Sequence, residues 1–439
     1  METRDALPRI GFRQVLANRE FRALFFAQSL SVIGDQFARV AIGVLVFSRT
    51  DSGLLTGLSY AVSYLPWLVG GPLLGVLGDR HQRRSVMVLC DLARAVLIAP
   101  AAIPQLPVPL LLMSIAATAM LQPLFTSARA ALIPEVVGEG PAYRAASTLT
   151  NSTLQGAVVV GFAAGGLITS TIGATATVAL DVVTFIASGL SIQLLVKPRR
   201  PAAGFEDHWW KAISIGAVAV FGSERLRSLV TTSWLVVGVT ISTEAAAVPY
   251  AHAHAGGAVA AGMLSAALPA GVVVGALWLG RTEDDTAERW FRRLSLATPT
   301  TLMATFANPP PPICGVVWFL GGVFSAASVL ANRLFLVSTP PHLRSRAFGV
   351  AAAGISGAQG LGTLFVGGLL SLVPPAQAVA IMAAATALAL VSMDPPWHQS
   401  SLRRRDLTPT SNTRRGWRQD ASPYLRGKRS TPSHDLPAR

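Results

Sequence analysis

The sequence predicts an all-α integral membrane protein whose twelve transmembrane helices form two pseudo-repeats of six. Mean hydropathy is +0.49, and only 13% of the residues are charged, where soluble domains carry about 25%. Apolar stretches of roughly 20 residues, the length of helix that crosses a bilayer, recur along the chain. A soluble protein would have to bury each of these stretches against protein on every side. The composition therefore excludes a soluble protein.

Twelve apolar runs stand between charged residues or Pro and Gly breaks, and each is an expected transmembrane helix. Their approximate limits are 23–48, 53–78, 85–103, 107–133, 143–170, 174–196, 228–250, 256–280, 291–308, 312–338, 346–372 and 374–393. The ninth run is the least apolar, because threonines dilute it and Pro299 interrupts it.

The connections between these runs alternate in charge, and this alternation orients the helices. Positively charged loops remain in the cytoplasm, and the even-numbered connections carry the clustered arginines and lysines. Five of the six odd-numbered connections have no charged residue, and the first has only Arg49 and Asp51. We therefore expect both termini in the cytoplasm and the chain in the cell (inner) membrane.

Two bundles with a longer polar connection between them suggest a duplicated unit. Arg129 and Arg144 flank a Pro-bearing turn in the first bundle, and Arg333 and Arg346 do so about 200 residues later. Secondary transporters often place a binding site between such repeats. The expected segments are a cytoplasmic N-terminal segment (1–22), a six-helix bundle (23–196), a linker (197–227), a second bundle (228–397) and a basic tail (398–439).

The formal charge of +14 does not indicate a nucleic-acid partner. Residues 401–439 hold ten basic and three acidic residues, and thus half of that charge. Their Pro, Ser and Thr content is typical of disorder. Two interpretations stay open, which are attraction to anionic lipid and a solvated tail with no partner.

The connection between the second and third runs carries a recognisable motif, Gly75-Val-Leu-Gly-Asp79-Arg80-His-Gln-Arg83-Arg84. It resembles the G-x-x-x-D-R-x-G-R-R/K signature of the major facilitator superfamily, with Gln82 where the family usually has Gly. By this resemblance, Asp79 and the arginines lock the cytoplasmic side in the outward-open state. Asp91, Arg94 and Arg129, near the inner ends of their helices, are expected to extend this gate network.

Further segments between residues 12 and 395 resemble the branch that holds the enterobactin exporter and macrolide-efflux-type proteins. They are Asn18-Arg-Glu-Phe-Arg22, Gly34-Asp35, Asp91-Leu-Ala-Arg94-Ala95, Ile133-Pro134-Glu135 and Arg344-Ser-Arg346-Ala-Phe-Gly349. In the fifth run, Gly161, Gly165 and Gly166 resemble the antiporter signature G-P-x-x-G-G, although Phe162 stands where Pro is usual. Close helix packing explains these glycines equally well.

Charged residues inside the expected helices are functional candidates, because a charge in the membrane is costly unless it is paired or wetted. Asp35 and Arg39 lie four residues apart, on one helix face. They suggest a local ion pair, with Asp35 either carrying protons or simply ordering the helix. Glu244 has no basic neighbour in its own run, which suits reversible protonation; the alternative is a water-exposed residue. Asp181 is interpreted as a structural anchor.

Other chemistries find little support in the sequence. No Walker loop, dinucleotide-binding turn, metal-binding helix pair or nucleophile elbow appears, so we expect no cofactor, no metal site and no enzyme activity. His252 and His254 lack a third metal ligand and are interpreted as loop residues. The aromatic side chains that either line a cavity or serve in packing are Tyr60, Tyr64, Trp67, Phe125 and Trp234.

These features together predict a proton-coupled secondary active exporter of a hydrophobic or amphipathic small molecule, such as a drug, secondary metabolite or siderophore. The two bundles would alternate access to a central cavity, and the protein is expected to work as a monomer in the lipid bilayer. A nutrient importer or uniporter is the first alternative, and a cavity rich in Asn, Gln and Lys would favour it. A non-transporting sensor or assembly protein is the second, and deletion of residues 401–439 would test it.

Overall fold

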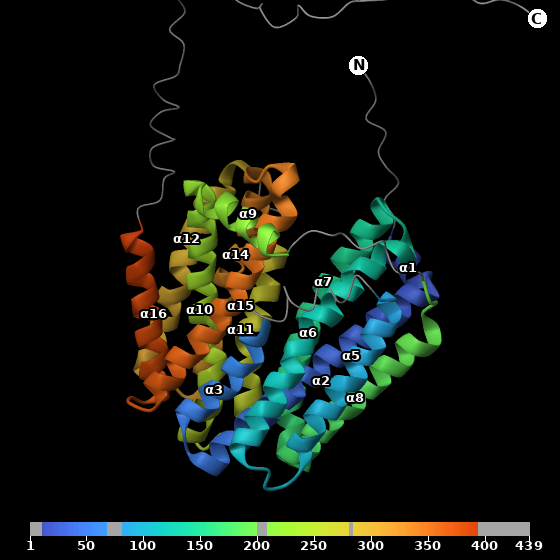
Figure 1. The fold of residues 1–439 in the computed structure, drawn as a ribbon. Helices are drawn as coiled ribbons and strands as arrows, with labels where there is room; N and C mark the ends of the chain where they lie inside the picture. The colour runs from blue at the N-terminus through green and yellow to red at the C-terminus, as the bar shows by residue number, and fades with distance from the viewer. Residues whose placement is uncertain (1–10, 68–80, 200–208, 281–283, 394–439) are drawn as a thin grey trace, which may run out of the picture. The chain divides into compact units, whose positions relative to one another are not determined.

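Helices make up nearly all of the chain that the computed structural model describes, which comprises residues 11–67, 81–199, 209–280 and 284–393 (Figure 1). No strand occurs within those residues. The predicted all-α class is confirmed.

The first six expected spans all correspond to helices. They are α2 (Arg19–Thr50), α3 (Gly53–Tyr64), α5 (Arg83–Ile98) with the 3-10 turn η1 (Ala99–Ala102), α6 (Val108–Val137), α7 (Pro141–Ile172) and α8 (Ala174–Leu195), preceded by a short α1 (Phe12–Ala17). α2 begins at a side-chain cap, because Asn18 accepts hydrogen bonds from the N–H groups of Glu20 and Phe21. Such a cap satisfies donors that the first helical turn leaves free.

The last six expected spans are helical as well. They are α10 (Glu224–Ala253), α11 (Gly257–Leu279), α12 (Asp284–Leu302) with η2 (Met303–Ala307), α13 (Pro311–Ser325) with α14 (Ala327–Ser338), α15 (Arg344–Leu370) with the preceding turn η3 (Pro341–Leu343), and α16 (Pro375–Ser392). Their core surrounds Trp318, whose indole N–H donates to Thr305 Oγ1 at 3.1 Å.

Among the described residues, ten helices are long and apolar enough to cross a membrane. The second expected span, 53–78, begins as α3 and then runs outside the described residues. The ninth is α12, whose threonines lower its hydropathy. Thr298 and Thr301 donate their hydroxyls to the carbonyls of Leu294 and Ala297, one turn back. These hydroxyls are therefore satisfied within the helix, as a span without access to water requires.

The linker contains a helix that the sequence did not predict, α9 (Trp209–Phe221). Charged residues around the apolar segment made the whole of 197–227 look like a polar connection. α9 packs on α15, where a Cβ on Gly216 would lie 2.4 Å from the carbonyl oxygen of Arg346. Val220 is buried against the beginnings of α10 and α15. The linker is therefore attached to the second set of helices.

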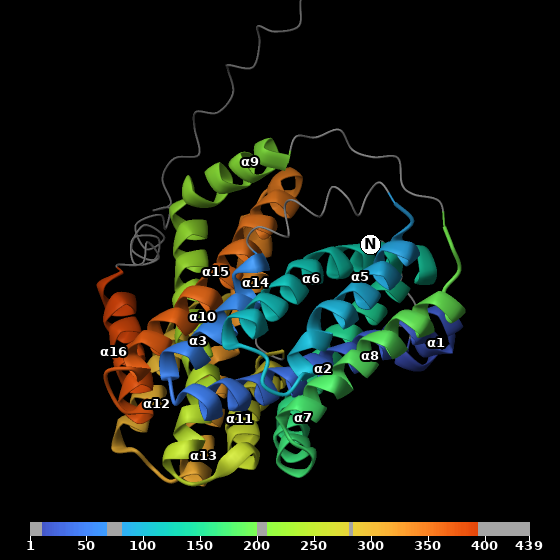
Figure 2. The same cartoon turned by 60° about the horizontal axis from the view of Figure 1, so that its bottom comes forward.

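The two sets of six helices pack on each other through the pairs α7–α11 and α3–α15 (Figure 2). Both pairs meet at glycines. A Cβ on Gly57 of α3 would lie 2.6 Å from the Cα atom of Gly367 on α15. One on Gly166 of α7 would lie 2.8 Å from the Cα of Gly262 on α11. These contacts join the ends of the four helices that lie farthest from the linker.

Candidate functional site

A cavity of about 420 Å³ lies among α2, α3, α5, α6, α7 and α8, and α15 closes it from the second set of helices. A volume of this order suits a drug-sized molecule. Apolar side chains form part of the wall. The polar and charged side chains that line it are Asp35, Gln36, Arg39, Ser59, Tyr60, Ser63, Tyr64, Arg94, Thr118, Gln122, Asp181, Ser356 and Gln359.

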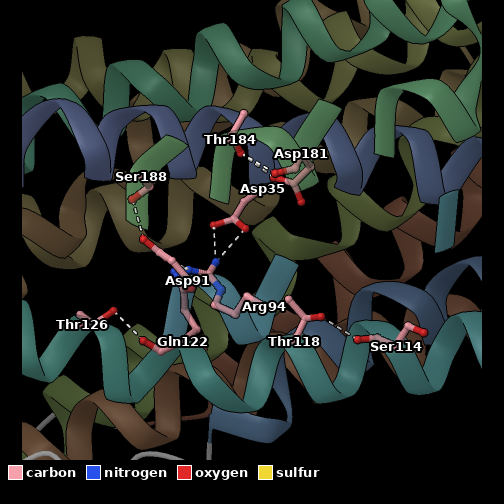
Figure 3. Close-up of polar contacts among 10 residues, drawn as sticks. All are labelled: Asp35, Asp91, Arg94, Ser114, Thr118, Gln122, Thr126, Asp181, Thr184 and Ser188. Carbon is pink, nitrogen blue, oxygen red and sulfur yellow. Dashed lines mark hydrogen bonds and ion pairs between the residues drawn. The ribbon is translucent and has the colours of Figure 1, made fainter. Parts of the chain in front are cut away.

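One wall of the cavity holds an ion-pair cluster centred on Arg94 of α5. Its Nη2 atom donates to both carboxylate oxygens of Asp35 on α2, at 2.9 and 3.2 Å. Its Nη1 atom lies 3.4 Å from Oδ1 of Asp91, one turn earlier on α5. Asp91 Oδ2 in turn accepts a hydrogen bond of 2.6 Å from Ser188 on α8 (Figure 3). The cluster therefore joins α2, α5 and α8.

Aromatic rings enclose the guanidinium of Arg94. Its central carbon lies 4.0 Å from the ring centroid of Phe185 and 5.8 Å from that of Phe125, within the range of cation–π attraction. The Arg94 side chain is 2% exposed, whereas 21% of the Asp35 side chain is exposed. Asp35 is therefore the member of the pair that a molecule in the cavity can reach.

Asp181 of α8 lies beside Asp35, and Figure 3 shows the two carboxylates on neighbouring helices with Arg94 on the far side of Asp35. Asp181 Oδ1 accepts a hydrogen bond of 3.0 Å from Thr184. Gly34 makes this approach possible, because a Cβ there would lie 2.4 Å from Asp181 Oδ1. Within the described residues, no basic side chain forms an ion pair with Asp181. Asp181 lines the cavity wall, and its expected role as an anchor remains a prediction.

The cluster therefore contains three carboxylates and one guanidinium. A buried charge without a partner is strongly unfavourable and is normally neutralised. The single positive charge of Arg94 compensates only one negative charge. Full ionisation of Asp35, Asp91 and Asp181 would therefore leave two negative charges in a poorly hydrated site. Protons or an added cation can remove this excess.

A second cluster joins the two sets of helices. Arg39 of α2 donates from Nη1 to Oε1 of Glu244 on α10 at 3.1 Å and to the hydroxyl of Tyr64 on α3 at 2.5 Å. The Tyr64 hydroxyl is also 3.1 Å from Oε2 of Glu244. Among the described residues this is the only ion pair between the first six helices and the last six.

Both expectations about these charges need correction. Arg39 pairs with Glu244 and not with Asp35, which Arg94 holds instead. Glu244 has a basic partner after all, supplied by a helix of the other set. Spacing along one helix indicates only partners within that helix, but these pairs span 59 and 205 residues of sequence.

The residues expected at the gate are only partly described. Gly75, Asp79 and Arg80 lie outside the described residues. Arg83 donates to the carbonyl of Ala131 at 2.9 Å and pairs with Glu135, and Arg84 bonds to the carbonyl of Gln193. Arg129 is buried, and its Nε atom has no partner in the described part of the chain.

Asp91 and Arg94, which were expected beside this gate, make their described contacts with Asp35, Ser188 and each other. Their expected role in the gate network remains a prediction.

The three glycines of α7 lie at close helix contacts. A Cβ on Gly161 would lie 2.7 Å from Cβ of Gln36, and one on Gly165 would lie 3.1 Å from the Cα of Phe37, both on α2. Gly166 instead contacts α11 of the other set. Close packing is therefore their observed role, and any role in antiport remains a prediction.

The aromatic candidates divide between the cavity and its surroundings. Tyr60, Tyr64 and Trp67 line the cavity. The ring of Phe125 lies against the guanidinium of Arg94, with 5.8 Å between the ring centroid and the central carbon. Trp234 is a packing residue whose indole donates to the carbonyl of Ala351.

The candidates predicted from the sequence did not include the cavity glutamines Gln36, Gln122 and Gln359. Polar residues within the apolar runs, repeating at helical spacing, were the signal that could have found them.

Comparison with known proteins agrees with this architecture. A profile described as Major Facilitator Superfamily matches residues 24–308. The multidrug efflux pump Tap of Mycolicibacterium fortuitum is 26% identical over 84% of this chain and 91% of its own length. The enterobactin exporter EntS of Shigella boydii serotype 4 (strain Sb227) is 27% identical over 81% of this chain and 86% of its own.

Solved transporters share the fold. The crystal structure of the nucleoside transporter NupG has a TM-score of 0.68 at 16% identity and covers 85% of this chain and 98% of its own. A bacterial homologue of the lysosomal transporter Spinster, inward-facing and unoccupied, has a TM-score of 0.63 at 15% identity, over 85% and 94%.

Proposed function

This chain belongs to the major facilitator superfamily, and on that premise we propose that it is a proton-coupled exporter of hydrophobic or amphipathic small molecules. The two sets of six helices would alternate access to the cavity from the two sides of the cell membrane. The observation that carries the proposal is the excess of carboxylates around Arg94, with Asp35 reaching into the cavity.

In this mechanism, Asp35 and its neighbour Asp181 bind and release the coupling protons. Protonation removes the uncompensated charge that burial makes costly, so it favours the state in which the cluster is dry. Deprotonation at the other side of the membrane restores the charge. Arg94 keeps Asp35 in position throughout, because the rings of Phe185 and Phe125 and the Asp91 carboxylate hold its guanidinium.

The contacts between the helix sets support loading from the cytoplasm. Gly57 with Gly367, and Gly166 with Gly262, close the end that lies away from the linker. The charge pattern of the connections predicts that this end faces outward, with both termini in the cytoplasm. A cavity closed on the outside can receive a molecule only from the inner side. The names of the relatives Tap and EntS, an efflux pump and an exporter, support the same direction.

Energised inside-out vesicles test the proposal. A pH-sensitive dye would follow proton movement while cationic, neutral and anionic amphiphiles are added one at a time. We expect at least one of them to release protons from vesicles with the wild-type chain. The Asp35→Asn variant should fold and give no release, because the amide cannot exchange a proton.

Asp51→Asn is the matched control. Asp51 is an exposed residue at the end of α2 with a left-handed backbone, which Asn tolerates. Proton release by Asp35→Asn at the wild-type level would remove Asp35 from the mechanism.

A second candidate, an importer or uniporter of a polar nutrient, gains support from Gln36, Gln122 and Gln359, because the cavity is more polar than the spans suggested. The direction of substrate movement separates export from import, and a proton-conducting uncoupler separates export from uniport. Export by the proposed mechanism stops when the gradient collapses, whereas downhill uniport continues.

A further inference from the structure

The charges around the cavity are unbalanced as a whole. Among the residues that the structure describes, four carboxylates and two guanidinium groups lie at the wall or directly behind it, and their full ionisation leaves two negative charges. These residues are Asp35, Asp91, Asp181, Glu244, Arg39 and Arg94.

Neither guanidinium is free to receive an anion. Arg94 is enclosed by rings and by two carboxylates, and only 2% of its side chain is exposed. Arg39 already bonds to Glu244 and to the Tyr64 hydroxyl. An anionic group in the cavity would meet no unpaired cation among the described lining residues. A cation would meet the exposed carboxylate of Asp35.

Neutral oxygens elsewhere on the cavity wall favour the same class of ligand. The side-chain Oε1 atoms of Gln36 and Gln122 are buried at the cavity wall and have no hydrogen-bond partner. Alkylammonium groups carry donors and no acceptor, as these oxygens require. Beyond them the wall is apolar, with Ile98, Ile115 and Val158, and would cover a hydrocarbon or aromatic body.

We propose that the cargo is an organic cation on an apolar body, and that its positive charge takes the place of protons at Asp35 and Asp181. This inference rests on the proposed export function, whose cargo class it specifies. Cargo and protons then compete for the same carboxylates, and this competition couples their opposite movements.

The groups that face Asp35 determine how this competition depends on pH. They are Arg94 and Asp91 of α5, Asp181 of α8 and Arg39 of α2 itself. α3 adds the hydroxyls of Tyr60 and Tyr64, while α6, α7 and α15 add only neutral side chains to the wall. Binding of a permanent cation should therefore weaken as the pH falls, because protons then occupy the carboxylates.

Tetraphenylphosphonium and tetraphenylborate test the cargo class, because they have nearly the same shape and opposite charge. Binding of each would be measured by equilibrium dialysis to the purified full-length chain in nanodiscs, with empty nanodiscs subtracted. We expect the cation to bind at least tenfold more tightly than the anion. Asp35→Asn should weaken cation binding roughly tenfold, because the variant removes the attraction of one negative charge at the cavity wall. Asp51→Asn should leave it unchanged.

Binding of the anion as tight as that of the cation would overturn the cargo class, and so would unchanged cation binding by both Asp35→Asn and Asp181→Asn. Thermal unfolding of each variant would establish that it is folded.

A pH dye in weakly buffered solution separates this inference from the proposed function. Cation binding with proton release supports both. Cation binding without release supports the cargo class, and contradicts both proton coupling and the displacement of protons by the cargo. Preferential anion binding, with proton release intact, contradicts the cargo class alone.

Discussion

Arg94 is the side chain on which the cavity cluster depends. It bonds to Asp35 and Asp91 from a position enclosed by Phe125 and Phe185. Removing one partner of a buried ion pair costs about 3–5 kcal/mol, because the other charge stays buried without compensation. The residue therefore fixes the positions of the carboxylates as well as balancing them.

We predict that Arg94→Met lowers the free energy of unfolding by about that amount. Methionine keeps an unbranched side chain but leaves the carboxylates of Asp35 and Asp91 unpaired. Thermal or denaturant unfolding in detergent would measure the loss. Arg225→Met is the matched control, because Arg225 is 48% exposed in its pair with Glu288. An exposed pair of this kind contributes only about 0–1 kcal/mol. Equal stability losses in the two variants would contradict the assignment.

At this scale the sequence identified the charged candidates but not their partners. Asp35, Arg39, Asp181 and Glu244 stand out because charges are rare in apolar runs, and the structure places the first three at the cavity wall and the last behind it. Which charge pairs with which depends on how helices from distant parts of the chain meet. Spacing along one helix does not contain that information.

The crossing of α7 and α11 is the point where single glycines control how closely the two sets of helices approach. A Cβ on Gly166 would meet the carbonyl oxygen of Ala258 at 2.5 Å, and backbone atoms cannot move aside as a flexible side chain can. Gly156, ten residues earlier on the same helix, has no atom within 4 Å of the corresponding position.

We predict that the same substitution has different effects on stability at these two positions. Gly156→Ala should be neutral or raise stability by up to about 1 kcal/mol, since Ala is the better helix former. Gly166→Ala should lower stability, because the added methyl group must push α7 away from α11. Melting temperatures of the two variants in the same detergent would measure both effects. A Gly166→Ala variant that melts at or above the wild-type temperature would show that the crossing is not close in solution.

The sequence predicted elements well where hydropathy defines them and poorly where it does not. Each of the twelve apolar runs contains all or part of a helix in the described residues. α9 was missed because its apolar segment lies among charged residues, and its stability depends on packing against α15. Propensity and pattern cannot reveal a helix that depends on a distant partner.

On the scale of the whole molecule, the pair Arg39–Glu244 joins the two sets of helices at equivalent positions. Arg39 lies 20 residues after the first residue of α2, and Glu244 lies 20 residues after that of α10. These are the first and seventh spans, which correspond in the two pseudo-repeats. If the two sets arose by duplication, as the sequence predicts, the opposite charges at corresponding positions are a departure from the repeat.

We predict that Arg39 and Glu244 are strongly coupled in a double-mutant cycle. Arg39→Gln and Glu244→Gln should each destabilise the protein, because each leaves the other charge buried. The double variant should be more stable than the sum of the single losses implies, by about 1–3 kcal/mol, since no unpaired charge then remains. Unfolding of the four proteins in the same detergent measures this coupling. The exposed pair Arg225–Glu288 is the control cycle, with an expected coupling below about 1 kcal/mol.

Alternating access would have to break the Arg39–Glu244 pair whenever the closed end opens. The double variant should therefore also expose that end more readily to a membrane-impermeant thiol reagent. The reagent would be directed at a cysteine introduced at Ser63. Additive losses, with no change in labelling, would mean that the pair is a local contact and does not hold the two halves together.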